Sequence, residues 1–180
     1  MTGAKTIADT LTVARVFLAL LILWLGMTSG AEALPAAATA LIFAWATDLL
    51  DGPFARRDPS GRQTWVGEHD LQADMCVGFA VLGYLVFSAF IPPWVGVAYL
   101  AIGAALLVYY RSAHMGMLVQ ALPYATILYV ALRHAVLQGA IALAWILLAV
   151  ILTWPRFPRE SVPGFLQGMR DLGRSRHEGP

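Results

Sequence analysis

Hydrophobic positions in this chain fall into six long stretches that are separated by short polar connections. The stretches cover residues 10–28, 34–55, 67–90, 94–110, 115–132 and 135–153. A helix needs about 20 mostly apolar residues to cross a bilayer. The pattern therefore predicts an all-α integral membrane protein, a six-transmembrane-helix bundle that occupies residues 1–157. Residues 158–180 are polar, and their apolar side chains recur at helical spacing, which predicts a partly amphipathic tail.

The composition supports the membrane assignment. Hydrophobic residues make up 59% of the 180 residues and charged residues only 13%. A soluble domain carries roughly 25% charged residues. The net charge of +1 says little by itself. No nucleic-acid partner is expected.

Basic residues are distributed unevenly over the predicted connections. If the six predicted spans cross the membrane in alternating directions, all of the connecting and terminal basic residues except Arg133 lie on one side. Loops rich in Lys and Arg stay in the cytoplasm. Both termini and the loop between the second and third spans are therefore predicted to be cytoplasmic. The residues on that side are Lys5, Arg56, Arg57, Arg62, Arg111, Arg156, Arg159, Arg170, Arg174 and Arg176.

Acidic residues cluster where the second span ends and the third begins. Asp48 and Asp51 are three positions apart, and Asp70 and Asp74 are four apart, so each pair shares a helix face. A hairpin joins the two helix ends, which allows the four carboxylates to converge. Carboxylates crowded near low dielectric repel one another unless cations bind. Hard oxygen ligands favour Mg²⁺, Mn²⁺ or Ca²⁺ over Zn²⁺.

Several neighbouring residues suit a phosphate-containing ligand. Gly52 permits close backbone approach, Ala55 leaves the next turn open, and Arg56 supplies a planar donor for phosphate. Arg15, near the cytoplasmic end of the first span, has two interpretations: it reaches the carboxylates or a phosphate, or it extends to the interface. The simpler alternative for the whole stretch is a solvated interfacial loop whose charges pair with one another.

The spacing of these residues resembles the signature of the CDP-alcohol phosphatidyltransferase family. The matching residues are Asp48, Asp51, Gly52, Ala55, Arg56, Asp70 and Asp74, with Gly67 as the candidate second glycine. The loop differs from the family pattern, because ten residues rather than eight separate Arg56 from Gly67, and two rather than three separate Gly67 from Asp70. Residues 9–15 are similar to an opening common in the phosphatidylglycerophosphate synthases of this family.

The resemblance implies a mechanism and a set of partners. Two divalent cations, Mg²⁺ or Mn²⁺, would be held by Asp48, Asp51 and Asp70 with Asp74, and Asp74 would also act as general base. CDP-diacylglycerol and a small polar alcohol would be the substrates, and CMP would be released at the cytoplasmic face of the cell membrane. Homodimers are common in such families. The residues implied in nucleotide binding are Gly52, Ala55, Arg56 and Gly67.

The acceptor alcohol is less well defined by the sequence. Glycerol 3-phosphate is favoured by residues 9–15, and Arg111 is the candidate ligand for its phosphate. Against this choice, Met75 follows Asp74 where that subgroup commonly has Lys. Inositol phosphate, serine and phosphatidylglycerol remain alternative acceptors. Outside this reaction, the alternatives are a prenyltransferase and a catalytically inactive membrane protein that binds divalent cations.

Overall fold

The computed structural model describes the backbone of residues 3–56, 70–110 and 112–154, and the side chains of residues 6–7, 9–50, 71–110, 112 and 114–154. The described residues form six α-helices, one short 3-10 helix and no strand. The prediction of an all-α protein is therefore confirmed. In chain order the elements are α1 (Gly3–Thr28), η1 (Gly30–Ala33), α2 (Leu34–Arg56), α4 (Asp70–Phe87), α5 (Pro93–Tyr110), α6 (Ala113–His134) and α7 (Val136–Leu152).

Each predicted span coincides with one of these helices, but the helices differ in length. Four apolar stretches are long enough to cross a membrane: Asp9–Thr28, Gly30–Leu50, Pro93–Tyr110 and His114–His134. The apolar parts of α4 and α7, Leu71–Phe87 and Val136–Leu152, are shorter. The described helices thus suggest a membrane protein with four candidate spans. The count of six spans and the cytoplasmic position of both termini stay predictions, and the predicted tail lies outside the described residues.

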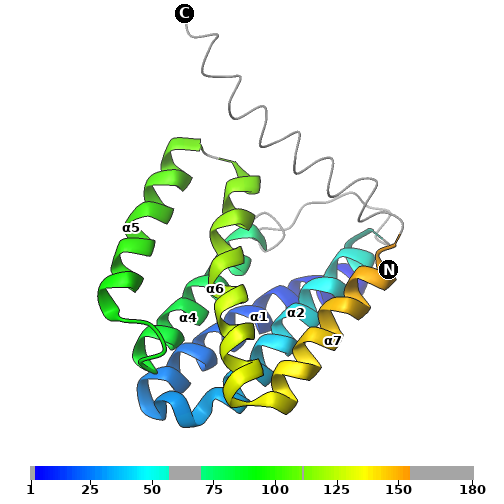
Figure 1. Ribbon diagram of the computed structural model, residues 1–180. Helices are drawn as coiled ribbons and strands as arrows, with labels where there is room; N and C mark the ends of the chain where they lie inside the picture. The colour runs from blue at the N-terminus through cyan, green and yellow to red at the C-terminus, as the bar shows by residue number, and fades with distance from the viewer. Residues whose placement is uncertain (1–2, 57–69, 111, 155–180) are drawn as a thin grey trace, which may run out of the picture.

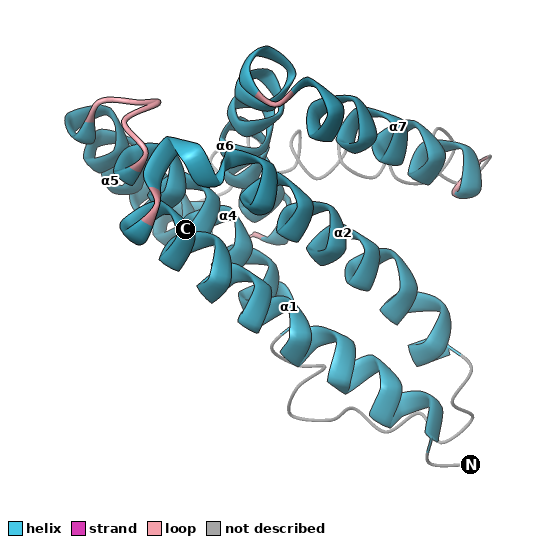
Figure 2. Ribbon diagram, turned by 90° about the horizontal axis from the view of Figure 1, so that it is seen from below, coloured by secondary structure: helices cyan, strands magenta, loops and turns pink. Residues whose placement is uncertain are grey.

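Helices α1, α2 and α4 form the centre of the bundle, where α1 packs against both of the others (Figure 1). Helix α6 packs against α4 and α7, and α7 also lies along α2, as Figure 2 shows from below. Helix α5 stands at the edge and contacts α4 and α6 (Figure 1). The arrangement brings the end of α2 and the start of α4 next to α1.

Small residues allow the central helices to approach closely. Helix α2 buries Ala37, Ala40 and Ala44 against its neighbours. A Cβ atom on Gly26 of α1 would lie 2.9 Å from the Cα atom of Tyr84 on α4. Helix packing in membranes relies on such small residues, because lipid gives no hydrophobic driving force for association.

The outer faces of the helices are largely apolar, and several threonine hydroxyls on them bond within their own helices. Phe17, Trp24 and Met27 of α1 are all exposed. The hydroxyls of Thr39 and Thr126 each donate to the carbonyl four residues earlier, at 2.7 and 2.8 Å. Such a surface leaves few polar groups without a partner in hydrocarbon, which suits contact with lipid chains.

Helix α6 continues through Pro123 because a neighbouring helix supplies a missing hydrogen bond. Proline has no N–H, so it cannot donate to the carbonyl four residues earlier, which is that of Val119. The Tyr99 hydroxyl of α5 donates to this carbonyl oxygen. The contact ties α5 to α6 and allows an apolar helix to contain a proline.

Candidate active site

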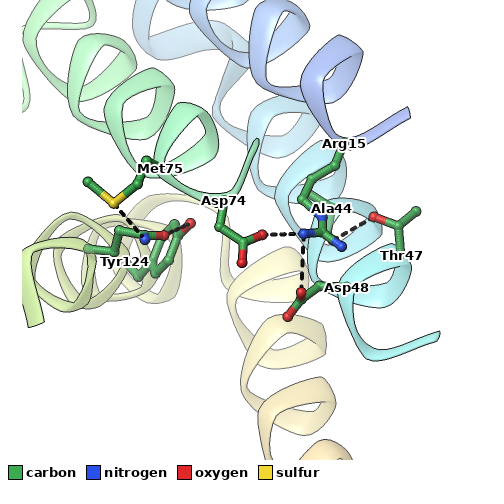
Figure 3. Close-up of polar contacts among 8 residues, drawn as sticks. Arg15, Ala44, Thr47, Asp48, Asp74, Met75 and Tyr124 are labelled. Atoms are coloured by element: carbon green, nitrogen blue, oxygen red, sulfur yellow. Dashed lines mark hydrogen bonds and ion pairs between the residues drawn. The ribbon is translucent and has the colours of Figure 1, made fainter. Parts of the chain in front are cut away.

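A buried arginine joins three helices at the acidic end of α2 and α4. Arg15 of α1 is only 1% exposed, and its Nη1 atom lies 3.2 Å from Oδ1 of Asp48 on α2. The same nitrogen donates to Oδ1 of Asp74 on α4. Figure 3 shows both carboxylates directed at this one nitrogen. Of the two interpretations of Arg15, the structure supports contact with the carboxylates.

The two carboxylates that contact Arg15 are partly exposed. The side chain of Asp48 is 52% exposed and that of Asp74 is 31% exposed, whereas the guanidinium is enclosed. A buried cation needs such partners, because an unpaired charge in low dielectric is very unfavourable. Two carboxylates around one guanidinium leave one formal negative charge in excess, which suits a further cation.

The two carboxylates face a cavity of about 190 Å³. Helices α1, α2 and α4 provide one side of this cavity, and α6 provides another. The described residues that line it are Arg15, Ala44, Trp45, Asp48, Asp74, Val77, Gln120 and Tyr124. We refer to it below as the Asp74 cavity.

The wall from α6 carries a polar pair that the sequence analysis did not identify. Gln120 is 7% exposed. The Tyr124 hydroxyl donates to Gln120 Oε1 at 3.1 Å, and Gln120 Nε2 donates to Met75 Sδ at 3.1 Å. The ring of Tyr124 meets that of Trp45 edge-on, with centroids 5.5 Å apart and planes at 87°. The available signal was a Gln and a Tyr four positions apart inside an apolar span, which places both on one face.

The remaining predicted site residues are placed only in part. Asp51, Gly52, Ala55 and Arg56 belong to the last turns of α2, and Asp70 is the first residue of α4. Their side chains, together with Gly67 and Arg111, lie outside the described residues. The backbone therefore puts Asp51 one turn from Asp48, and Asp70 one turn from Asp74.

The described side chains contain no group of three or more His, Cys, Asp or Glu residues that could hold a metal ion. The donor chemistry nevertheless fits a hard cation. Asp48 and Asp74 come from different helices and converge on one atom, so their carboxylates are close enough to share a ligand. Oxygen donors of this kind are those that Mg²⁺ and Mn²⁺ prefer.

The fold and the site define a class: an all-helical protein with apolar spans and converging carboxylates at a cavity. A family model, CDP-alcohol phosphatidyltransferase, matches residues 5–155, and the chain therefore belongs to this family. Searches of curated proteins and of solved structures gave no match. The family transfers a phosphatidyl group from a CDP-alcohol to an acceptor and generally depends on divalent metal.

Proposed function

We propose that this protein is a membrane enzyme of phospholipid biosynthesis that transfers the phosphatidyl group of CDP-diacylglycerol to a hydroxyl of a polar alcohol and releases CMP. The observation that carries the proposal is the convergence of Asp48 and Asp74 on Arg15 at the Asp74 cavity. These two carboxylates are the members of the family signature whose side chains are described, and they come from opposite ends of the motif.

In the proposed reaction Asp74 accepts the proton of the acceptor hydroxyl. The acceptor oxygen then forms a bond to the phosphorus atom that carries the diacylglycerol, and the bond between this phosphorus and the oxygen of CMP breaks. CMP leaves with the bonding electron pair. A carboxylate within reach of the hydroxyl suits this role, and Arg15 holds the Asp74 carboxylate in place through its hydrogen bond.

The proposed cation ligands are Asp48, Asp51, Asp70 and Asp74. When bound, Mg²⁺ or Mn²⁺ would neutralise the diphosphate and stabilise the departing CMP. Arg15 supplies a fixed positive charge between two of these carboxylates and so limits their mutual repulsion before a cation binds. The proposed nucleotide contacts are Gly52, Ala55, Arg56 and Gly67.

Glycerol 3-phosphate is the acceptor that we favour. This choice is supported by the similarity of residues 9–15, which end at Arg15, to the opening common in phosphatidylglycerophosphate synthases. Arg111 is proposed to bind the acceptor phosphate. Inositol phosphate, serine and phosphatidylglycerol are the other acceptors within the family.

The proposed location is the cell membrane, with the site facing the cytoplasm and two copies of the chain in a homodimer. The uneven distribution of arginines supports this orientation. It also suits the substrates, because CDP is water-soluble whereas the diacylglycerol chains are not.

The test is CMP release from CDP-diacylglycerol by the purified protein, with Mg²⁺ or Mn²⁺ and a panel of alcohols. We expect CMP to appear only when the metal and an acceptor are both present. A prenyltransferase would instead release pyrophosphate from a prenyl diphosphate, and a cation-binding protein without activity would release neither. Absence of CMP with every alcohol would contradict the proposal.

A further inference from the structure

We propose that Gln120 and Tyr124 form the acceptor-binding wall of the Asp74 cavity and recognise a hydroxyl next to the one that reacts. The acceptor is then a vicinal diol or polyol rather than an amino alcohol. This inference rests on the proposed transferase activity, and it adds a class of acceptor and two binding residues on α6 that lie outside the acidic motif.

The side chain of Gln120 occupies a space between α4 and α6, opposite Gly78. A Cβ atom on Gly78 of α4 would lie 2.8 Å from Cγ of Gln120 and 3.5 Å from its Cβ. These atoms are near the backbone of α6, so the side chain could not move aside easily. Only glycine at position 78 therefore admits the Gln120 amide between α4 and α6, and the amide still reaches the cavity.

The N–H groups of the Gln120 amide have a weak hydrogen-bond acceptor. Its Nε2 atom carries two N–H groups, and the described residues offer it one acceptor, the thioether sulfur of Met75 at 3.1 Å. A thioether is a poor acceptor, and buried polar groups usually have good hydrogen-bond partners. The oxygen of a ligand hydroxyl would be a stronger acceptor for this amide.

The pair lies beside the proposed base and contacts residues of two other helices, Met75 of α4 and Trp45 of α2. Met75 follows Asp74 on α4, so the residue that contacts Gln120 is the immediate neighbour of the residue that would accept the proton. Trp45 packs against the ring of Tyr124, and the Tyr124 hydroxyl donates to Gln120 Oε1. When the reacting hydroxyl of an acceptor contacts Asp74, the adjacent carbon of the acceptor would therefore lie next to Gln120 and Tyr124.

The chemistry of this wall selects a hydroxyl over charged groups. An ammonium group has only donors, so it cannot accept from the Gln120 amide. A phosphate could accept, but its charge requires cations nearby, and Arg15 already binds both carboxylates. A neutral hydroxyl both donates and accepts, which matches an amide and a phenol.

The experiment compares two acceptors in three proteins. The probes are glycerol 3-phosphate and 3-hydroxypropyl phosphate, which lacks the middle hydroxyl. For the wild type we expect kcat/KM to be at least about tenfold higher with the diol, because the analogue leaves the buried amide with only the thioether of Met75 as acceptor. In Gln120→Leu and Tyr124→Phe this ratio should fall to roughly twofold or less, mainly through a higher KM for the diol.

Gln138→Leu on α7 and Tyr129→Phe on the exposed face of α6 are the matched controls, and each should keep the wild-type ratio. A ratio that stays high in folded Gln120→Leu or Tyr124→Phe would overturn the inference, even if the thermal stability in detergent falls. If Gln120→Leu does not fold, Tyr124→Phe decides alone, since it keeps the ring against Trp45. If serine were the only alcohol of the panel that supports CMP release, the diol assignment alone would be overturned. If no alcohol supported CMP release, the transferase proposal would be overturned as well.

Discussion

Arg15 donates a hydrogen bond to Asp74, a residue 59 positions later in the chain, and thereby connects α1 to α4. The same Arg15 nitrogen contacts Asp48 on α2. The acidic motif belongs to α2 and α4, yet its two described carboxylates are positioned by a residue of α1. The first helix is therefore part of the site.

Replacing Arg15 by Met should cause loss of activity and of stability. The substitution keeps a similar length but leaves Asp48 and Asp74 without their buried cation. Breaking a fully buried ion pair costs about 3–5 kcal/mol, and the partial exposure of both carboxylates reduces this to about 2 kcal/mol. Thermal unfolding in detergent and CMP release measure the two effects. Arg133→Met on the exposed end of α6 is the control, and wild-type activity in Arg15→Met would contradict the positioning role.

Asp74→Asn should abolish turnover while nucleotide binding persists. The amide oxygen of Asn can still accept from Arg15, but it cannot take a proton from the acceptor at a useful rate. We expect kcat to fall by at least about 100-fold, within the range that general-base catalysis contributes. The affinity for CDP-diacylglycerol, measured by calorimetry, should change much less. Activity near that of the wild type would remove Asp74 as the base.

Asp48→Ala should weaken the dependence on divalent cations. Removing one oxygen ligand lowers the affinity of the proposed site, so half-maximal activity should require about tenfold more Mn²⁺ or more. A metal titration of CMP release measures this directly. Glu32→Ala, in η1 at the other end of α2, should leave the titration unchanged. The same Mn²⁺ requirement in Asp48→Ala would contradict its assignment as a ligand.

Tyr99→Phe should destabilise the bundle without affecting the chemistry. The substitution removes the hydroxyl that donates to the Val119 carbonyl, which Pro123 leaves without its helical donor. A lost hydrogen bond of this kind costs roughly 1 kcal/mol. Thermal unfolding should show a lower midpoint, whereas Tyr129→Phe, with an exposed ring, should not. Equal stability of the two variants would show that the freed carbonyl needs no partner.

Gly26→Ala should separate α1 from α4. The new methyl group would lie 2.9 Å from the Cα atom of Tyr84, and a backbone atom cannot move aside without shifting a helix. We expect a loss of stability of about 1–3 kcal/mol, as in other overpacked interiors. Gly116→Ala is a matched control, because its nearest neighbour, Met75 Sδ, lies at an ordinary 3.4 Å. A neutral Gly26→Ala variant would mean that the interface can adjust.

The sequence was most informative where a local pattern determines the structure. Long apolar runs predicted the helices, because burial of backbone polar groups in lipid leaves few alternatives. The spacing of Asp48 and Asp74 within their motif predicted that these carboxylates meet. Gln120 was missed because a single polar residue in an apolar run does not reveal its partner. Its contact with Met75 depends on how α4 and α6 pack, and on the space that Gly78 leaves between them.

The link through Arg15 also has a consequence for the biogenesis of the protein. Translation proceeds from the N-terminus, so the guanidinium emerges before either of the carboxylates that it will bind. Asp48 can join it as soon as the second helix is made, but the three-way junction closes only when α4 has been delivered to the membrane. The nascent chain therefore contains the positive charge of Arg15 before either of its carboxylate partners, and the contact among the three helices can be completed only after α4 has been made.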